Sequence, residues 1–328
     1  MRKFLISLII GVIILSILFF NINLVDLSQR IATASPSFVL MSFMFILFFT
    51  TLKAVRWRML VGKGRLINFF SIVQIGSLLT NILPAQLQEP IRAVLLKEKE
   101  KIEIGHGLSS IFVERLMDII GLLVIGIIAS ILFPTTDAVQ SWIFVIIRNI
   151  IIFTSILTGF FIILVLKPTL FSRIFHPFKK NQRLAKLYDK FEFLLLDLSK
   201  GVKKISKKPT NLIGSFLLTI FMWMINFLAV YLLFISVNFQ IDPILILFGF
   251  VGTALGMSLP QSPGYVGTFE AIWLGAFSTL GYEKNDEILA VGILYHLLVI
   301  IHNFVLGIIG MFILKLSIKE LFNFKKKS

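Results

Sequence analysis

Ionisable side chains surrounded by apolar residues are the first candidates for chemistry in this sequence. Glu89 and Arg92 lie three residues apart, so on a helix they share one face. Glu114, Arg115 and Asp118 form a second group, in which the two carboxylates are four residues apart. A charge inside a membrane is costly and is usually paired or functional. Each group could therefore stabilise the fold as ion pairs or take part in function.

Two interpretations are open for each group. Glu89 and Arg92 either neutralise each other and fix the local backbone, or bind a lipid phosphate. In the second case Glu89 orients the guanidinium of Arg92, which can bind phosphate through two hydrogen bonds. Glu114, Arg115 and Asp118 are expected to be either a cytoplasmic gate or a brace to the segment that carries Glu89, and we favour the brace.

A third candidate is the stretch at residues 259–270, which reads LPQSPGYVGTFE. Proline and glycine break a helix and free backbone groups for other contacts. The residues expected to do so are Pro263, Gly264 and Gly267. Glu270 follows in the first turn of a predicted helix, where it either caps the helix or takes a proton or the cationic part of a substrate. His296, further along, is either a packed residue or a phosphate or proton site.

The composition places these groups in a membrane protein. The chain has 328 residues, of which 57% are hydrophobic and 15% charged, with a mean hydropathy of +0.93. These values exclude an ordinary soluble domain. Basic cytoplasmic loops would account for the net charge of +15, which also suits contact with anionic headgroups. There is no cysteine. No cofactor-binding or metal-ligand pattern occurs, so we expect no cofactor, no metal and no nucleic-acid partner.

Basic residues predict which segments face the cytoplasm. An apolar run from Phe4 to Phe20 follows a basic start, and we interpret it as a retained first span rather than a signal peptide. A second span begins at Pro36. A basic cluster follows it, and its members Lys53, Arg56 and Arg58, beside Trp57, are expected to be interfacial anchors.

Two interrupted segments are predicted to be re-entrant hairpins, at residues 66–97 and 243–280. If residues 68–83 crossed fully, the lysines at 97–101 and the basic loop at 167–210 would lie outside, against the positive-inside rule. A hairpin entered from the cytoplasm and broken near Pro84 avoids this. The second hairpin enters from outside, because residues 281–287 are acidic. Non-helical backbone at that depth must be buried or line a wet cavity. We therefore expect the two breaks to face each other and to form a translocation site.

These elements predict an all-α polytopic membrane protein with six full spans plus two oppositely oriented re-entrant hairpins in an inverted-topology repeat. The first repeat is residues 1–166, including a linking fourth span. The second repeat is residues 211–328. The loop at 167–210 carries twelve Lys or Arg against three acids. Its amphipathic helix is expected either on an anionic lipid surface or packed on the transmembrane domain. Both termini are predicted to be cytoplasmic, in a multi-pass protein of the cell membrane.

Three different motifs follow one another along nearly the whole chain. They are Asn81-Ile82-Leu83-Pro84 with Glu89 and Arg92, then Glu114-Arg115-Leu116 with Asp118, then Pro260 and Pro263-Gly264 with Gly267 and Glu270. Together they resemble the flippase-like family named after the transmembrane part of lysylphosphatidylglycerol synthase. Ala85 and Gln88 stand where that family has glycines, and His296 stands where an arginine is common. The resemblance implies a stand-alone translocase without the soluble domain that makes the aminoacyl lipid.

The leading hypothesis is a flippase-like protein that is not an enzyme. It would move a membrane phospholipid, with aminoacylated phosphatidylglycerol among the candidates, or a polyprenyl-phosphate lipid between leaflets. Arg92 would be the main phosphate contact and Glu270 the opposing polar group. One alternative is a membrane transferase with Glu89, Glu114 or Asp118 as base. Another is a non-catalytic subunit whose basic loop recruits a cytoplasmic partner. The sequence leaves the lipid and a homo-oligomer open.

Overall fold

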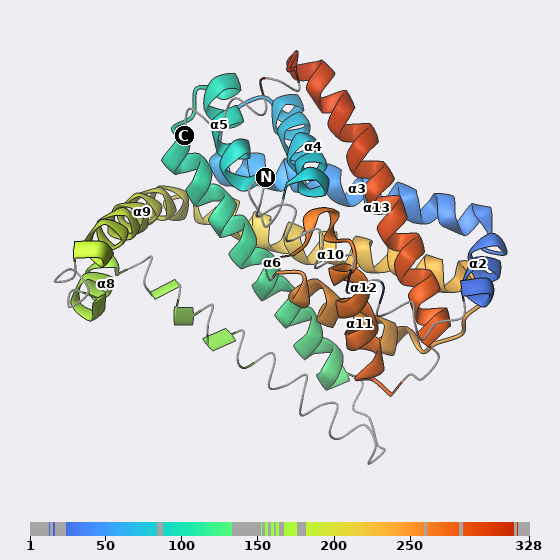
Figure 1. Cartoon of the computed structure of the whole chain (residues 1–328). Coiled ribbons are helices and arrows are strands. Elements are labelled where there is room, and N and C mark those ends of the chain that lie inside the picture. The colour runs from blue at the N-terminus through green and yellow to red at the C-terminus, as the bar shows by residue number, and fades with distance from the viewer. Residues whose placement is uncertain are drawn as a thin grey trace.

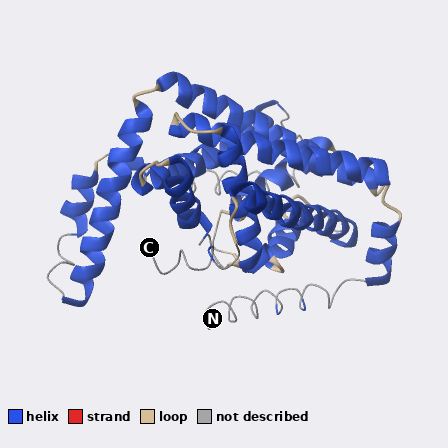
Figure 2. Cartoon of the chain, turned by 90° about the horizontal axis from the view of Figure 1, so that it is seen from above, coloured by secondary structure: helices blue, strands red, loops and turns tan. Residues whose placement is uncertain are grey.

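The computed structural model is helical throughout the part of the chain that it describes (Figure 1). It describes residues 24–83, 88–132, 167–175, 182–258, 261–281 and 285–317, together with a few isolated positions. Seen from above, these residues form helices and loops and no strand (Figure 2). The predicted first span and most of the predicted fourth span lie outside the described residues.

Three of the described helices are long and apolar enough to cross a membrane. They are α3 (Pro36–Val61), α10 (Pro209–Ser236) and α13 (Asn285–Leu314). Proline at the first position of α3 and α10 suits a helix start, where the backbone N–H has no partner in any case. α6 (Ile104–Leu132) is of similar length and carries the charged group at 114–118. The chain is therefore an all-α membrane protein. The number of crossings stays a prediction.

The helical path is interrupted at both places where the sequence predicts a break. α4 (Leu66–Ile82) gives way to extended backbone at Leu83, and α5 (Gln88–Glu100) follows. Later, α11 (Pro243–Gly256) is followed by the short 3₁₀ helix η2 (Pro263–Tyr265) and then α12 (Thr268–Ser278). Gly264 and Gly267 have φ of +62° and +77°, backbone that glycine adopts without the strain of a Cβ.

The helices pack in pairs around these interruptions. α3 lies along α10, α4 packs on α13, and α11 packs on α6. α5 contacts α6, and α12 contacts α13. In Figure 1, α6 and α13 run in opposite directions across the molecule. The short α2 (Leu24–Ala32) joins α13 through a 2.7 Å salt bridge between Arg30 and Glu287.

Glycine permits the close contact of α13 with α4. A Cβ at Gly307 of α13 would lie 2.4 Å from the Cβ of Leu78 on α4, and one at Gly310 would lie 2.8 Å from the carbonyl oxygen of Ser71. A side chain at either position would therefore collide with α4. The backbones of α4 and α13 approach each other here because α13 presents small residues, as membrane helices often do.

The predicted amphipathic helix is α9 (Gln182–Ser206), which follows α8 (Pro168–Phe175). Its apolar face packs on α6, where Tyr188 and Leu195 are buried against the partly buried Phe112. The arrangement in the structure is therefore the second of the two expected, a helix packed on the membrane domain. Phe193, on another face of α9, is 73% exposed.

Candidate functional site

Six charged side chains form a continuous chain of ion pairs between α3, α5 and α6. The order is Asp118, Arg56, Glu114, Arg92, Glu89 and Arg115. We call these residues the ion-pair chain. Arg56 contacts Asp118 at 2.5 Å and Glu114 at 3.0 Å. Arg92 contacts Glu114 at 3.0 Å and Glu89 at 2.9 Å, and Arg115 pairs with the second oxygen of Glu89. Each carboxylate thus has at least one guanidinium partner.

The expected interfacial anchors include two residues that the structure places elsewhere. The side chain of Arg56 is fully buried, and so is Trp57. Lys53 lines a cavity between the helices. The prediction is wrong for Arg56 and Lys53, because an anchor must reach the membrane surface. Arg58 is exposed.

Arg56 is a candidate site residue that the spacing of the charged residues does not reveal. Its signal was a charge imbalance: the first two candidate groups together held three carboxylates, Glu89, Glu114 and Asp118, but only two arginines. An unpaired carboxylate inside a protein is expensive, so a third cation had to lie nearby. Arg56 supplies it and also donates to the hydroxyl of Thr219 on α10, at 2.8 Å.

The ion-pair chain makes the contacts expected of a brace. The Glu89–Arg92 pair occurs within α5, as the spacing predicts. Glu114 and Arg115 of α6 each reach across to α5. The guanidinium of Arg92 also lies 4.3 Å from the centre of the Trp57 ring, a cation–π contact. Both terminal nitrogens of Arg92 are therefore occupied by carboxylates of the protein itself.

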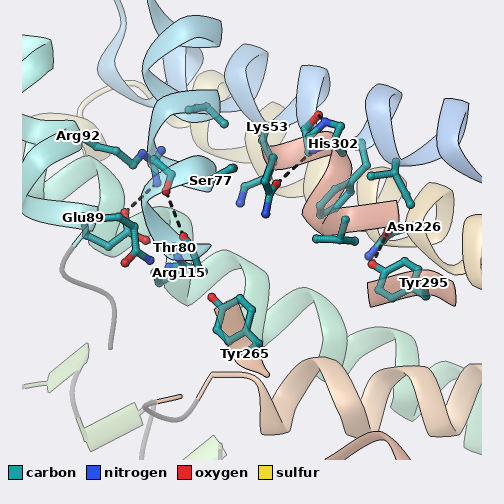
Figure 3. A pocket seen from close by; sticks show the side chains of 18 residues that line it. Lys53, Ser77, Thr80, Glu89, Arg92, Arg115, Asn226, Tyr265, Tyr295 and His302 are labelled. Atoms are coloured by element: carbon teal, nitrogen blue, oxygen red, sulfur yellow. Dashed lines mark hydrogen bonds and ion pairs between the residues drawn. The ribbon is translucent and has the colours of Figure 1, made fainter. Parts of the chain in front are cut away.

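A polar cavity of about 170 Å³ adjoins this network (Figure 3). The ion-pair chain contributes Glu89, Arg92 and Arg115 to its wall. The remaining polar lining comes from α3, α4, α5, α10, η2 and α13: Thr50, Lys53, Ser77, Thr80, Gln88, Asn226, Tyr265, Tyr295, His302 and Asn303. The cavity therefore lies where the first interrupted segment meets the second.

Neutral groups on one side of the cavity bond to one another. The hydroxyl of Thr50 lies 2.9 Å from Nε2 of His302, and the hydroxyl of Tyr295 donates to Asn226 at 3.0 Å. No cluster of metal ligands occurs among the described residues. Charged and neutral hydrogen-bonding groups thus face one space, as binding of a polar headgroup requires.

The second group of predicted site residues forms a separate buried cluster. Glu270 accepts a hydrogen bond from the backbone N–H of Gly267 at 2.7 Å, which caps α12. Its other oxygen lies 2.6 Å from Nδ1 of His296, and Nε2 of His296 lies 2.8 Å from the carbonyl oxygen of Gly264. Glu270 is 5% exposed and His296 is 6% exposed. Neither residue is among those that line the cavity.

This cluster fixes the turn between α11 and α12. A carbonyl oxygen only accepts, so Nε2 of His296 carries a hydrogen toward Gly264. The cluster therefore ties the positive-φ turn to α13, and Tyr265 of the same turn lines the cavity.

The two interrupted segments contact each other, as expected from the sequence. η2 packs on α4, and a Cβ at Gly264 would lie 3.5 Å from the carbonyl oxygen of Asn81. The amide of Asn81 also lies near Asn303 of α13, with 3.4 Å between donor and acceptor. The described ends of both interruptions thus border the same polar region.

The fold and the site define a polytopic helical membrane protein with a polar cavity between its helices. The chain belongs to the family described as the lysylphosphatidylglycerol synthase TM region, which it matches over residues 4–307. The resemblance drawn from its motifs is confirmed.

Its relatives are themselves described only as membrane proteins. The UPF0104 membrane protein MJ1595 of Methanocaldococcus jannaschii is 24% identical over 96% of this chain and 96% of its own length. MJ1078 of the same organism is 26% identical over 67% of this chain and 87% of its own. The UPF0104 membrane protein PH1989 of Pyrococcus horikoshii is 22% identical over 87% of this chain and 89% of its own length. No solved structure matches the chain.

Proposed function

We propose that this protein translocates a phospholipid or a polyprenyl-phosphate-linked lipid between the leaflets of the cell membrane. Aminoacylated phosphatidylglycerol is among the candidate lipids. The observation that carries the proposal is the polar cavity at the meeting point of two interrupted helices, inside an apolar bundle. A headgroup would pass through the cavity, while the acyl chains stay in the surrounding lipid.

The pairing of helices supports an inverted-topology repeat. If α3, α4, α5 and α6 are exchanged with α10, α11, α12 and α13, the contact of α4 with α13 becomes that of α11 with α6. The contact of α5 with α6 likewise becomes that of α12 with α13. Such repeats place substrate sites at their interface, near the bilayer midplane. We therefore propose six spans and two opposed re-entrant hairpins, with both termini cytoplasmic.

The candidate residues divide into two roles. Glu89, Arg92 and Arg115 form a polar wall of the cavity, held in place by Arg56, Glu114 and Asp118. The second set shapes the turn that brings Tyr265 to the cavity: Pro263, Gly264, Gly267, Glu270 and His296. In this proposal Glu270 and His296 act on the lipid through the turn rather than by contact, since their polar atoms already have protein partners.

One face of the basic helix α9 packs on α6, and the opposite, exposed face is proposed to rest against an anionic leaflet. Its exposed face carries Phe193 and Leu196 together with Lys200, Lys203 and Lys204. An apolar pair flanked by lysines suits a surface of acidic headgroups.

A lipid translocation assay tests the proposed function. The purified protein is reconstituted into liposomes that contain a fluorescent phosphatidylglycerol, and a membrane-impermeant reductant is added outside. Protein-free liposomes should keep the fluorescence of their inner leaflet, whereas the protein should make that pool accessible as well. The assay is run with and without an imposed proton gradient, and again with a polyprenyl-phosphate lipid. Behaviour identical to protein-free liposomes under all these conditions would reject the proposed function.

A further inference from the structure

Among the described residues of the cavity and the ion-pair chain, positively charged groups outnumber negatively charged groups by one. In the ion-pair chain three arginines face three carboxylates, so its formal charges cancel. Lys53 lines the same cavity and forms no salt bridge with any described residue (Figure 3). Each of the three carboxylates of the ion-pair chain already contacts an arginine. The cavity therefore carries a net formal charge of +1.

The surroundings of Lys53 do not neutralise it. Its ammonium nitrogen lies 6.0 Å from the centre of the Phe49 ring, a contact that is weak beside an ion pair. The neighbouring cavity groups on α3 and α13 are Thr50, Tyr295 and His302, which offer hydrogen bonds and no negative charge. Because a cation inside a membrane protein is costly without a counter-ion, this position favours an anion in the cavity.

A second polar group in the cavity lacks a partner. Gln88 of α5 is 4% exposed and lines the cavity. Its side-chain oxygen accepts no hydrogen bond from any described residue. A carbonyl oxygen accepts and cannot donate, so it calls for a hydroxyl or an ammonium group on the ligand.

We propose that Lys53 is the residue that binds the phosphate of the transported lipid, and that the substrate is a monoanionic phosphodiester whose headgroup also carries a hydrogen-bond donor for Gln88. This inference rests on the proposed function. It assigns the phosphate to Lys53 in place of Arg92, whose two terminal nitrogens are occupied by Glu89 and Glu114, so that only its Nε has no partner among the described residues. One negative charge on the ligand brings the net formal charge of the cavity to zero, whereas the dianion of a phosphate monoester would leave a net negative charge.

Binding of water-soluble lipids to the full-length protein in detergent tests this assignment. Dihexanoyl phosphatidylglycerol is titrated into wild type, Lys53→Met, Lys53→Arg and Lys63→Met. Lys63 is an exposed lysine outside the cavity and provides a matched control. We expect Lys53→Met to weaken binding about tenfold or more, the worth of a charge-assisted hydrogen bond. Lys53→Arg should recover most of the affinity, and Lys63→Met should match wild type.

Two further ligands identify what is recognised. Dihexanoylglycerol has the same acyl chains and no phosphate, so its affinity should not depend on Lys53. Inorganic phosphate should bind much more weakly than the lipid. Tighter binding of inorganic phosphate than of the phospholipid would overturn the lipid assignment, and equal affinity of wild type and Lys53→Met for phosphatidylglycerol would overturn the role of Lys53.

The binding test is separable from the transport test. Lys53-dependent lipid binding by a protein that moves no lipid would retain this inference and reject the proposed function. If a folded Lys53→Met or Lys53→Gln variant binds lipid as wild type does and translocates it at the wild-type rate, the role of Lys53 is rejected. The proposed function is then retained. Gel filtration of each variant establishes that it is folded.

Discussion

At the scale of single residues, the site is organised by the cost of charge in an apolar setting. Glu114 is the centre of the ion-pair chain, because Arg56 and Arg92 each contact one of its oxygens. The sequence predicts that Glu89 and Arg92 are partners, since their spacing is local. The contact of Arg56 with Glu114 joins residues 58 positions apart, and no local spacing could reveal it.

Arg56 is expected to be essential for stability. Arg56→Met removes the partner that Asp118 and Glu114 share and leaves charge buried without compensation. The expected cost is about 3–5 kcal/mol, as when one member of a buried ion pair is removed. It should appear as a large fall in the melting temperature of the purified protein. Arg58→Met, at an exposed arginine two residues on, should change the melting temperature little. Equal melting temperatures for the two variants would show that the ion-pair chain does not stabilise the fold.

At the scale of helices, the sequence predicts where a helix is interrupted but not which helices come into close contact. Proline and glycine at 259–270 predict a broken helix because they restrict or free the backbone locally. The packing of α4 on α13 depends on Gly307 and Gly310 lying opposite Leu78 and Ser71. Glycine inside an apolar run gives no indication of its partner, so this contact could not be predicted.

Two glycine-to-alanine changes separate close packing from helix propensity. Gly307→Ala places a methyl group where only 2.4 Å separates it from the Cβ of Leu78, so α4 and α13 must move apart. We expect it to destabilise the protein by about 1–3 kcal/mol, the usual cost of overpacking. Gly275 lies in α12, and a Cβ there would meet nothing within 4 Å. Gly275→Ala should therefore be neutral or stabilising by up to about 1 kcal/mol.

Thermal unfolding of both variants under the same detergent conditions compares the two effects. A Gly307→Ala protein as stable as Gly275→Ala would contradict the close approach of α4 and α13.

At the scale of the whole molecule, the account depends on topology. Composition and basic loops correctly predict an all-α membrane protein, because hydropathy and charge are summed over long segments. The same sums cannot place an ion-pair chain or a cavity, which depend on contacts between helices distant in sequence. The six crossings and the inverted repeat stay predictions that direct labelling can test.

Single cysteines can be introduced freely because the chain has none. Glu98→Cys, at an exposed position of α5, should react with an impermeant thiol reagent only after the cytoplasmic face is opened. Gln240→Cys, in the exposed loop before α11, should react from outside in intact cells. Labelling of both positions from the same side would contradict the opposed hairpins.

The central claim is that lipid headgroups pass through the cavity between the interrupted helices, and obstruction of that cavity tests it most directly. Ser77→Trp fills the cavity from α4, whereas Leu40→Trp adds the same ring to α3 at a residue that is 60% exposed. The measurement is the rate of phosphatidylglycerol translocation in liposomes that contain equal amounts of folded protein. The account predicts that Ser77→Trp abolishes translocation and that Leu40→Trp retains the wild-type rate. Undiminished translocation by Ser77→Trp would contradict it.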